Sequence, residues 1–155
     1  MLPNICYNDG EPYKKYMEIS MAMNNQLILD IGTFKGHSAY AFAINKTNIV
    51  KTFDIDNFVE IDLPDNVWFY KKSCMDIDKD LLDRADVILL DVDHHDGAQE
   101  KEFFESLLKT KFKGLLIVDD INLFKEMREW WDSIDLNKEE VNWHHSGTGL
   151  ISFNQ

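Results

Sequence analysis

The sequence is poor in cysteine and has no hydrophobic run long enough to cross a membrane. Only Cys6 and Cys74 occur among its 155 residues, too few for a disulfide framework, so we expect a reducing cytoplasm. The longest apolar stretches have the length of strands, far short of the ~20 residues that span a bilayer. The first four residues lack the basic and apolar regions of a secretory signal. These absences favour a cytoplasmic protein without a membrane partner.

Positive charge is also scarce. Sixteen Lys and Arg stand against 28 Asp and Glu, which gives a formal net charge of −12. Nucleic-acid binding needs clustered Lys and Arg to neutralise phosphates, so we expect no nucleic-acid partner. The hydrophobic fraction, 45%, is that of a folded globular protein with room for one core. We therefore expect a single domain over residues 1–155, with an N-terminal helical region at 1–25 and a core at 26–155.

Strand-sized apolar runs alternate with amphipathic helical patterns along the chain. The predicted strands are residues 26–31, 49–54, 67–70, 87–91 and 114–120, and the predicted helices are residues 11–24, 36–45, 97–109 and 124–134. Residues 141–145 and 150–153 predict a terminal hairpin around a glycine-containing turn. This order predicts an α/β fold: a Rossmann-like, doubly wound, mainly parallel sheet with an antiparallel C-terminal hairpin.

A glycine-containing turn follows the first predicted strand. It contains Gly32 and Gly36, lacks the lysine of a phosphate-binding Walker loop, and lacks the third glycine of a dinucleotide fingerprint. Asp54 ends the second strand 22 residues after Gly32, a spacing that suits hydrogen bonds to ribose hydroxyls. Together these features favour an adenosine-type cofactor. The alternative is a tight turn beside a solvated acid.

Acidic residues end the fourth and fifth predicted strands. Asp91 ends one, and Asp119 and Asp120 end the other. If the two strands are neighbours, about 4.8 Å apart, the three carboxylates converge and repel one another unless a cation joins them. Mg²⁺ or another hard divalent cation suits such oxygen ligands. The alternative is a set of solvated strand-end acids, one of which caps the next helix.

These motifs, in this order over roughly residues 26–153, resemble class I S-adenosylmethionine-dependent methyltransferases. The small O-methyltransferases of the catechol, caffeoyl-CoA and macrocin types are the most similar group. The resemblance implies S-adenosylmethionine (SAM) as cofactor, with Asp54 on its ribose, Ser38 near its carboxylate and residues 73–76 near its adenine. The implied cofactor-binding residues are Asp30, Gly32, Thr33, Phe34, Gly36, His37, Ser38, Asp54, Ile55, Ser73, Cys74, Met75 and Asp91. The implied metal ligands are Asp91, Asp119 and Asp120, although catechol-type enzymes often have Asp-Asn where this chain has Asp-Asp.

The resemblance also implies the catalytic residues. His94 falls near the place of the catalytic lysine of catechol-type enzymes, where it can deprotonate a substrate hydroxyl, and Asp91 lies beside it. Alternatively, His94 orients Asp91 or caps the helix near residue 97, and His95 is expected to be exposed or to lie behind the site. A zinc site at His144 and His145 is not expected, because adjacent residues on a strand point to opposite faces.

The expected function is SAM-dependent O-methylation of a small-molecule hydroxyl, either with or without a metal. Three alternatives stay open: a protein of the same fold that binds or cleaves SAM, a non-enzymatic module whose acidic surface docks a basic partner, and a nicotinamide dehydrogenase, which the missing glycine disfavours. A homo-oligomer is a further option, since the chain has no large insertion that can serve as a lid. The sequence does not identify the methyl acceptor.

Overall fold

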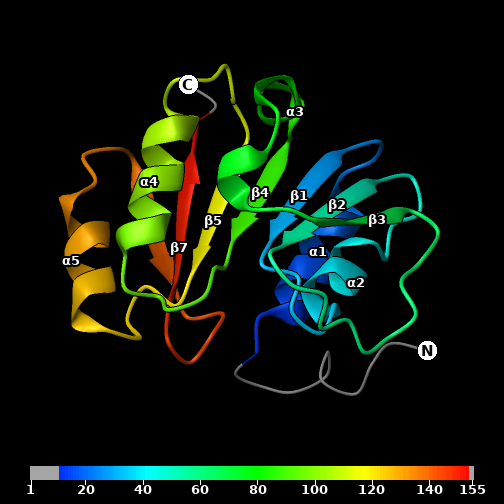
Figure 1. Cartoon of the computed structure of the whole chain (residues 1–155), viewed down its shortest axis with the longest axis horizontal. Coiled ribbons are helices and arrows are strands. Elements are labelled where there is room, and N and C mark those ends of the chain that lie inside the picture. The colour runs from blue at the N-terminus through cyan, green and yellow to red at the C-terminus, as the bar shows by residue number, and fades with distance from the viewer. Residues whose placement is uncertain (1–10, 154–155) are drawn as a thin grey trace.

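The computed structural model describes residues 11–153, in which seven strands form one sheet between two layers of helices (Figure 1). The strand order is β3-β2-β1-β4-β5-β7-β6. The strands are β1 (Leu27–Ile31), β2 (Ile49–Asp54), β3 (Val67–Lys71), β4 (Val87–Leu90), β5 (Leu115–Asp119), β6 (Lys138–Val141) and β7 (Thr148–Ser152). Strands β1 to β5 are parallel, and β7 is antiparallel to both of its neighbours. The predicted fold class is confirmed.

Helices cover both faces of this sheet. They are α1 (Tyr13–Ala22), α2 (His37–Phe42), α3 (Lys79–Arg84), α4 (Ala98–Leu107) and α5 (Lys125–Ser133), with a short 3₁₀ turn at Cys74–Asp76. Successive strand residues point to opposite faces, so β1 contributes to two cores. Ile28 packs with α1 and α2, whereas Leu29 and Ile31 pack with α3, α4 and α5. The continuous apolar runs noted in the sequence are therefore strands that are buried on both faces.

Three local predictions differ from the structure. The first helix is shorter than residues 11–24, and the first ten residues of the predicted N-terminal region lie outside the described residues. Helix α3 was not predicted, because six residues are too few to show a clear helical period. The hairpin strand predicted at 141–145 is wrong: β6 spans Lys138–Val141. Its charged residues suit an edge strand and hide the alternation that identifies buried strands.

The sheet has a topological switch point between β1 and β4. From these neighbouring strands the order runs to β2 and β3 on one side and to β5 on the other. In open sheets of this kind, ligands bind outside the carboxyl ends of the strands at this point. Among residues 11–153, we find no helix long and apolar enough to cross a membrane.

Candidate functional site

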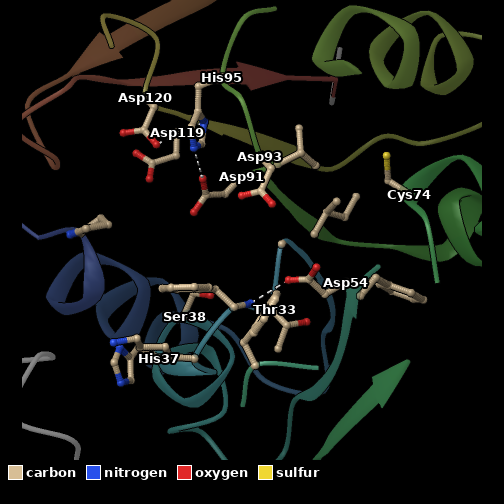
Figure 2. Close-up of a pocket in the computed structure, with 18 of the residues that line it drawn as sticks. Thr33, His37, Ser38, Asp54, Cys74, Asp91, Asp93, His95, Asp119 and Asp120 are labelled. Carbon is tan, nitrogen blue, oxygen red and sulfur yellow. Dashed lines mark hydrogen bonds and ion pairs between the residues drawn. The ribbon is translucent and has the colours of Figure 1, made fainter. Parts of the chain in front are cut away.

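A cavity of about 480 Å³ lies at the carboxyl ends of β1, β2, β4 and β5, where the switch point predicts a ligand. Figure 2 shows its two sides: Thr33, His37, Ser38 and Asp54 on one, and His95, Asp119 and Asp120 on the other. Its volume falls in the range of roughly 300–1,000 Å³ that is usual for small-molecule sites. Residues from the start of α1, including Tyr13 and Tyr16, complete the lining.

The turn after β1 packs directly on the end of β4. Gly32 has φ of 101°, and its N–H donates to the carbonyl of Phe53 at 2.8 Å. A Cβ on Gly32 would lie 1.6 Å from the carbonyl oxygen of Asp91, so no side chain fits. Glycine is therefore required here both by the left-handed backbone and by the close approach of two chain segments.

Asp54 presents a held carboxylate to the cavity. Its Oδ2 accepts a hydrogen bond from the backbone N–H of Phe34 at 2.9 Å, while Oδ1 has a longer contact, 3.4 Å, with the N–H of Asp56. Because Asp54 also lines the cavity, it can still accept hydrogen bonds from a ligand hydroxyl. This geometry fits the ribose-binding role that its spacing from Gly32 predicted.

Asp30 lies beneath the turn and is not among the residues that line the cavity. Its carboxylate accepts hydrogen bonds from Ser38 at 2.9 Å and from Thr52 at 2.7 Å. Burial raises the pKa of Asp30 to about 6, although these two hydrogen bonds lower it. Asp30 therefore orients Ser38, which does line the cavity, instead of contacting a ligand itself.

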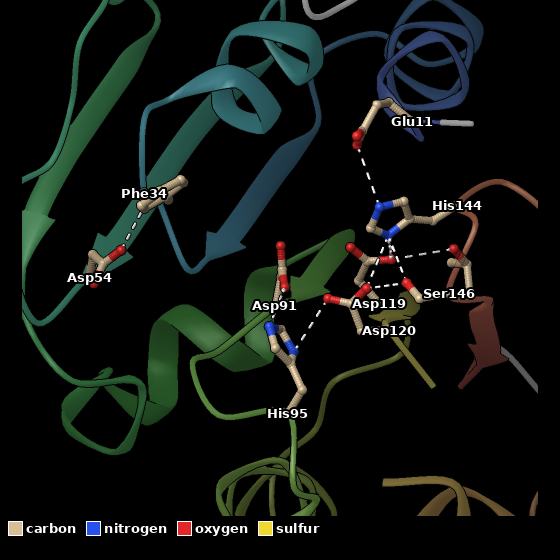
Figure 3. A network of polar contacts seen from close by, with 10 residues as sticks. Glu11, Phe34, Asp54, Asp91, His95, Asp119, Asp120, His144 and Ser146 are labelled. Atoms are coloured by element: carbon tan, nitrogen blue, oxygen red, sulfur yellow. Dashed lines mark hydrogen bonds and ion pairs between the residues drawn. The ribbon is translucent and has the colours of Figure 1, made fainter. Parts of the chain in front are cut away.

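The opposite wall is an acid–histidine cluster. It consists of Asp91, His95, Asp119, Asp120 and His144, all of which line the cavity (Figure 3). Nδ1 of His144 lies 3.0 Å from Oδ1 of Asp119 and 3.1 Å from Oδ1 of Asp120. Nδ1 of His95 lies 3.3 Å from Oδ2 of Asp120, and its Nε2 lies 3.8 Å from Oδ1 of Asp91. The strand-end acids thus converge as predicted, with two imidazoles among them.

The electrostatics of the cluster favour positive charge. Burial, and then the charges of Asp119 and Asp120, hold the pKa of Asp91 well above its usual value, and burial also raises the pKa of Asp119. Burial lowers the pKa of the His144 ring, but hydrogen bonds and charges from Asp119 and Asp120 outweigh it and raise the pKa to about 10. Neighbouring carboxylates that raise the pKa of one another and of an adjacent imidazole indicate a site suited to a cation.

Most of the predicted site residues line this one cavity. They are Gly32, Thr33, Phe34, His37, Ser38, Asp54, Ile55, Cys74, Asp91, Asp119 and Asp120. The predicted residues that do not line it are Asp30, Gly36, Ser73, Met75 and His94. Ser73 instead accepts a hydrogen bond from the N–H of Met75 and caps the 3₁₀ turn, which leaves Cys74 as the residue of this segment that reaches the cavity.

The two adjacent histidines after β4 lie in the reverse of the expected arrangement, in which His94 faces the site and His95 is exposed or behind it. His94 is exposed, whereas His95 is partly buried and lines the cavity. Both have left-handed backbones, with φ of 73° and 47°, so the chain turns sharply and directs the second imidazole inward. No periodic pattern marks this turn in the sequence, so the inward residue of the pair could not be chosen there.

The structure contradicts the expectation that His144 and His145 lie on a strand. His144 and His145 lie in the β6–β7 loop, not on a strand, and their rings form an edge-to-face pair with centroids 4.3 Å apart. Nε2 of His144 also lies 3.4 Å from a carboxylate oxygen of Glu11, a further cavity residue. In the sequence, the glycine-containing turn at 146–149 is the feature that indicates this position. It leads into β7, whose pairing with β5 brings the loop to the end of β5.

Comparisons with known proteins identify the fold. No family model and no curated protein sequence matches the chain. Among solved structures, the O-methyltransferase TomG from Streptomyces achromogenes, in complex with SAM, has a TM-score of 0.68 at 18% identity, with 90% of this chain and 78% of that chain covered. The O-methyltransferase from Bacillus cereus, in complex with S-adenosylhomocysteine (SAH), has a TM-score of 0.62 at 14% identity, with 90% of this chain and 79% of that chain covered. A methyltransferase from Geobacter sulfurreducens has a TM-score of 0.64 at 15% identity, with 92% of this chain and 79% of that chain covered. The chain therefore has the fold of class I SAM-dependent methyltransferases, as its motifs indicated.

Proposed function

We propose that the protein is a SAM-dependent methyltransferase that methylates a hydroxyl group of a small molecule. The observation that carries this proposal is that Asp54 and the acid–histidine cluster face one cavity from opposite sides (Figure 2). A nucleoside bound at Asp54 then extends toward groups that can receive a proton. The structural neighbours named as O-methyltransferases, two of them in complex with SAM or SAH, support the same reaction.

The residues present fit this cofactor. Asp54 supplies an acceptor for the ribose hydroxyls, and the absence of a side chain at Gly32 lets the turn pack against the backbone of Asp91. Ile55 and Cys74 add apolar surface to the cavity. SAM, when bound, supplies a methyl group on a positively charged sulfur, and transfer of this group leaves SAH as a neutral thioether.

The chain's own contribution to the reaction is alignment and proton removal. An acceptor hydroxyl must lose its proton when it is methylated, and Nε2 of His95, which lines the cavity, would take that proton. Asp120, 3.3 Å from Nδ1 of His95, then stabilises the imidazolium. Of the predicted catalytic pair, Asp91 keeps its place beside this imidazole, and His95 takes the role that was assigned to His94.

A divalent cation also fits the donor set. Asp91, Asp119 and Asp120 all line the cavity and offer the carboxylate oxygens that such ions prefer. These residues would hold the ion, which would lower the pKa of an acceptor hydroxyl.

The first test is calorimetric titration of the protein with SAM and with SAH in the presence of EDTA. We expect micromolar dissociation constants, about −8 kcal/mol. Asp54→Ala should weaken binding of both compounds at least tenfold, because the carboxylate that accepts hydrogen bonds from the ribose hydroxyls is lost. Asp56→Ala is the matched control, since Asp56 is exposed and contacts Asp54 only through its backbone N–H. Absence of binding by the wild-type protein would overturn the proposal.

The second test follows SAH formation during a screen of small hydroxyl compounds. Methyl transfer predicts that SAH accumulates only when an acceptor is present. Turnover of SAM without any acceptor would identify a SAM-cleaving enzyme instead, and binding without turnover across phenols, sugars and carboxylates would contradict O-methylation.

A further inference from the structure

The loop between β6 and β7 brings an imidazole to the carboxylates at the end of β5 (Figure 3). We propose that Nδ1 of His144 is a metal ligand together with Asp119 and Asp120, and that this mixed site selects a first-row transition ion such as Mn²⁺ or Zn²⁺ over Mg²⁺. The inference builds on the proposed function by naming the class of metal beside the acceptor, but it is tested by metal binding alone.

The distances within this triad are those of a coordination shell. Around an ion with ligands at about 2.1 Å, adjacent donors are about 3.0 Å apart in octahedral geometry and about 3.4 Å apart in tetrahedral geometry. Nδ1 of His144 lies 3.0 Å from the nearer oxygen of Asp119 and 3.1 Å from that of Asp120. One donor atom from each of the three residues lies within 4.8 Å of the others. The three groups are therefore already placed to share one ion.

The groups behind the triad orient it as the surroundings of a metal site do. A histidine ligand commonly donates its other ring N–H to a carboxylate, which fixes the tautomer. Nε2 of His144 lies 3.4 Å from Oε2 of Glu11 and can make this contact. Ser146 donates to Asp120, and Thr148 lies 3.5 Å from Oδ1 of Asp119. Glu11, Ser146 and Thr148 thus hold all three candidate ligands.

The backbone at Asp120 also serves this arrangement. Its φ of 61° is left-handed, which is uncommon for a residue other than glycine and is typical of functional sites. Because of this turn, Asp120 lies 3.1 Å from His144 through Oδ1 and 3.3 Å from His95 through Oδ2. A strand continuing past Asp119 would send two successive side chains to opposite faces. The turn instead keeps both carboxylates at one site.

The imidazole decides the choice of metal. Mg²⁺ is held by oxygen ligands and keeps several waters, whereas imidazole is a good ligand for transition ions such as Zn²⁺. A site made only of Asp91, Asp119 and Asp120, as the sequence indicated, has no such preference. His144 is therefore the residue that converts a magnesium-like site into one for a transition ion.

The experiment is calorimetric titration of metal-free protein with MnCl₂, ZnCl₂ and MgCl₂. We expect the wild-type protein to bind Mn²⁺ and Zn²⁺ at least tenfold more tightly than Mg²⁺. His144→Gln should weaken Mn²⁺ and Zn²⁺ at least tenfold and leave Mg²⁺ within about threefold. His94→Gln is the matched control, because His94 is exposed and does not line the cavity, so all three affinities should stay unchanged. Equal affinity for Mg²⁺ and Mn²⁺, or unchanged binding in His144→Gln, would overturn the proposal.

A measurement on the unmutated protein covers the case in which His144→Gln does not fold. Addition of one equivalent of Zn²⁺ should shift the ¹⁵N resonance of Nδ1 of His144 and not those of His94. If neither histidine responds, the ring only pairs with the acids and the inference is wrong. SAM titration in EDTA keeps the two proposals separate: intact SAM binding with no metal preference contradicts the metal site alone.

Discussion

At the scale of single residues, Gly32 carries the closest contact of the site. We expect Gly32→Ala to destabilise the fold by at least about 2 kcal/mol, because a left-handed alanine is strained and its Cβ would collide with the backbone of Asp91. Gly36→Ala is the matched comparison: its φ is also positive, 97°, but its Cβ would meet only the side chains of Ile61 and Leu63, at 3.2 Å or more. Urea denaturation of both variants measures the difference.

The comparison separates collision from backbone strain. If strain alone matters, Gly32→Ala and Gly36→Ala lose the same free energy of unfolding. The larger expected loss at Gly32 reflects backbone atoms of Asp91, just after β4, which cannot move aside as side chains do. Equal losses would show that the turn can retreat from Asp91, and the close packing of the cavity floor would then be less important than we infer.

Residues near strand ends could be predicted well from the sequence, because an apolar run followed by an acid marks the end of a buried strand. Asp54, Asp91, Asp119 and Asp120 all follow this pattern and all line the cavity. His144 could not be found in this way, since its place depends on how a loop returns to β5 and not on any local period. Asp30 also follows an apolar run, but β1 continues through Ile31, so Asp30 lies inside the strand and is buried.

At the scale of elements, the loop after β4 determines which histidine serves the reaction. We expect His95→Gln to lower kcat about 100-fold with little change in SAM affinity, because the group that takes the proton is lost. His94→Gln is the matched control and should retain kcat, since His94 is exposed and does not line the cavity. Initial rates of SAH formation with an identified acceptor provide the measurement. The reverse result, with His94→Gln inactive and His95→Gln active, would restore the assignment made from the sequence.

The accuracy with which the elements could be predicted from the sequence depends on how they are buried. Strands β1, β2, β4 and β5 were placed within one or two residues, because their apolar runs are buried on both faces. β6 was misplaced because its sequence, Lys-Glu-Glu-Val, is polar and pairs only with β7. Loops that carry His95 and His144 have no hydrophobic pattern at all, so their course depends on contacts distant in the sequence.

At the scale of the whole molecule, buried acids make stability depend on pH. Burial raises the pKa of Asp30 to about 6 and that of Glu100, on α4, to about 7. Both folded-state values lie above those of the unfolded chain, so the folded protein holds protons that the unfolded chain releases first. The free energy of unfolding should therefore fall as pH rises from about 4.5 to about 7.

Asp120 acts in the opposite sense. Burial raises its pKa, but hydrogen bonds with His144 and Ser146 outweigh burial, so the pKa of Asp120 is lowered. Its contribution to stability is therefore lost only as pH falls below about 4. Maximum stability is thus expected near pH 4.5.

Glu100 allows this prediction to be tested with one substitution. Its side chain is nearly fully buried, and the rise in pKa from 4.5 to about 7 corresponds to at most about 3 kcal/mol. Glu100→Gln removes the ionisable group, so stability between pH 5 and pH 8 should decline less steeply than in the wild-type protein. Glu102→Gln, at an exposed position of the same helix, should keep the wild-type slope. Urea denaturation across this pH range in EDTA measures both slopes. A Glu100→Gln slope as steep as the wild-type one would mean that Glu100 stays ionised in the folded protein, and the pH dependence would then have to come from Asp30 and the acid–histidine cluster.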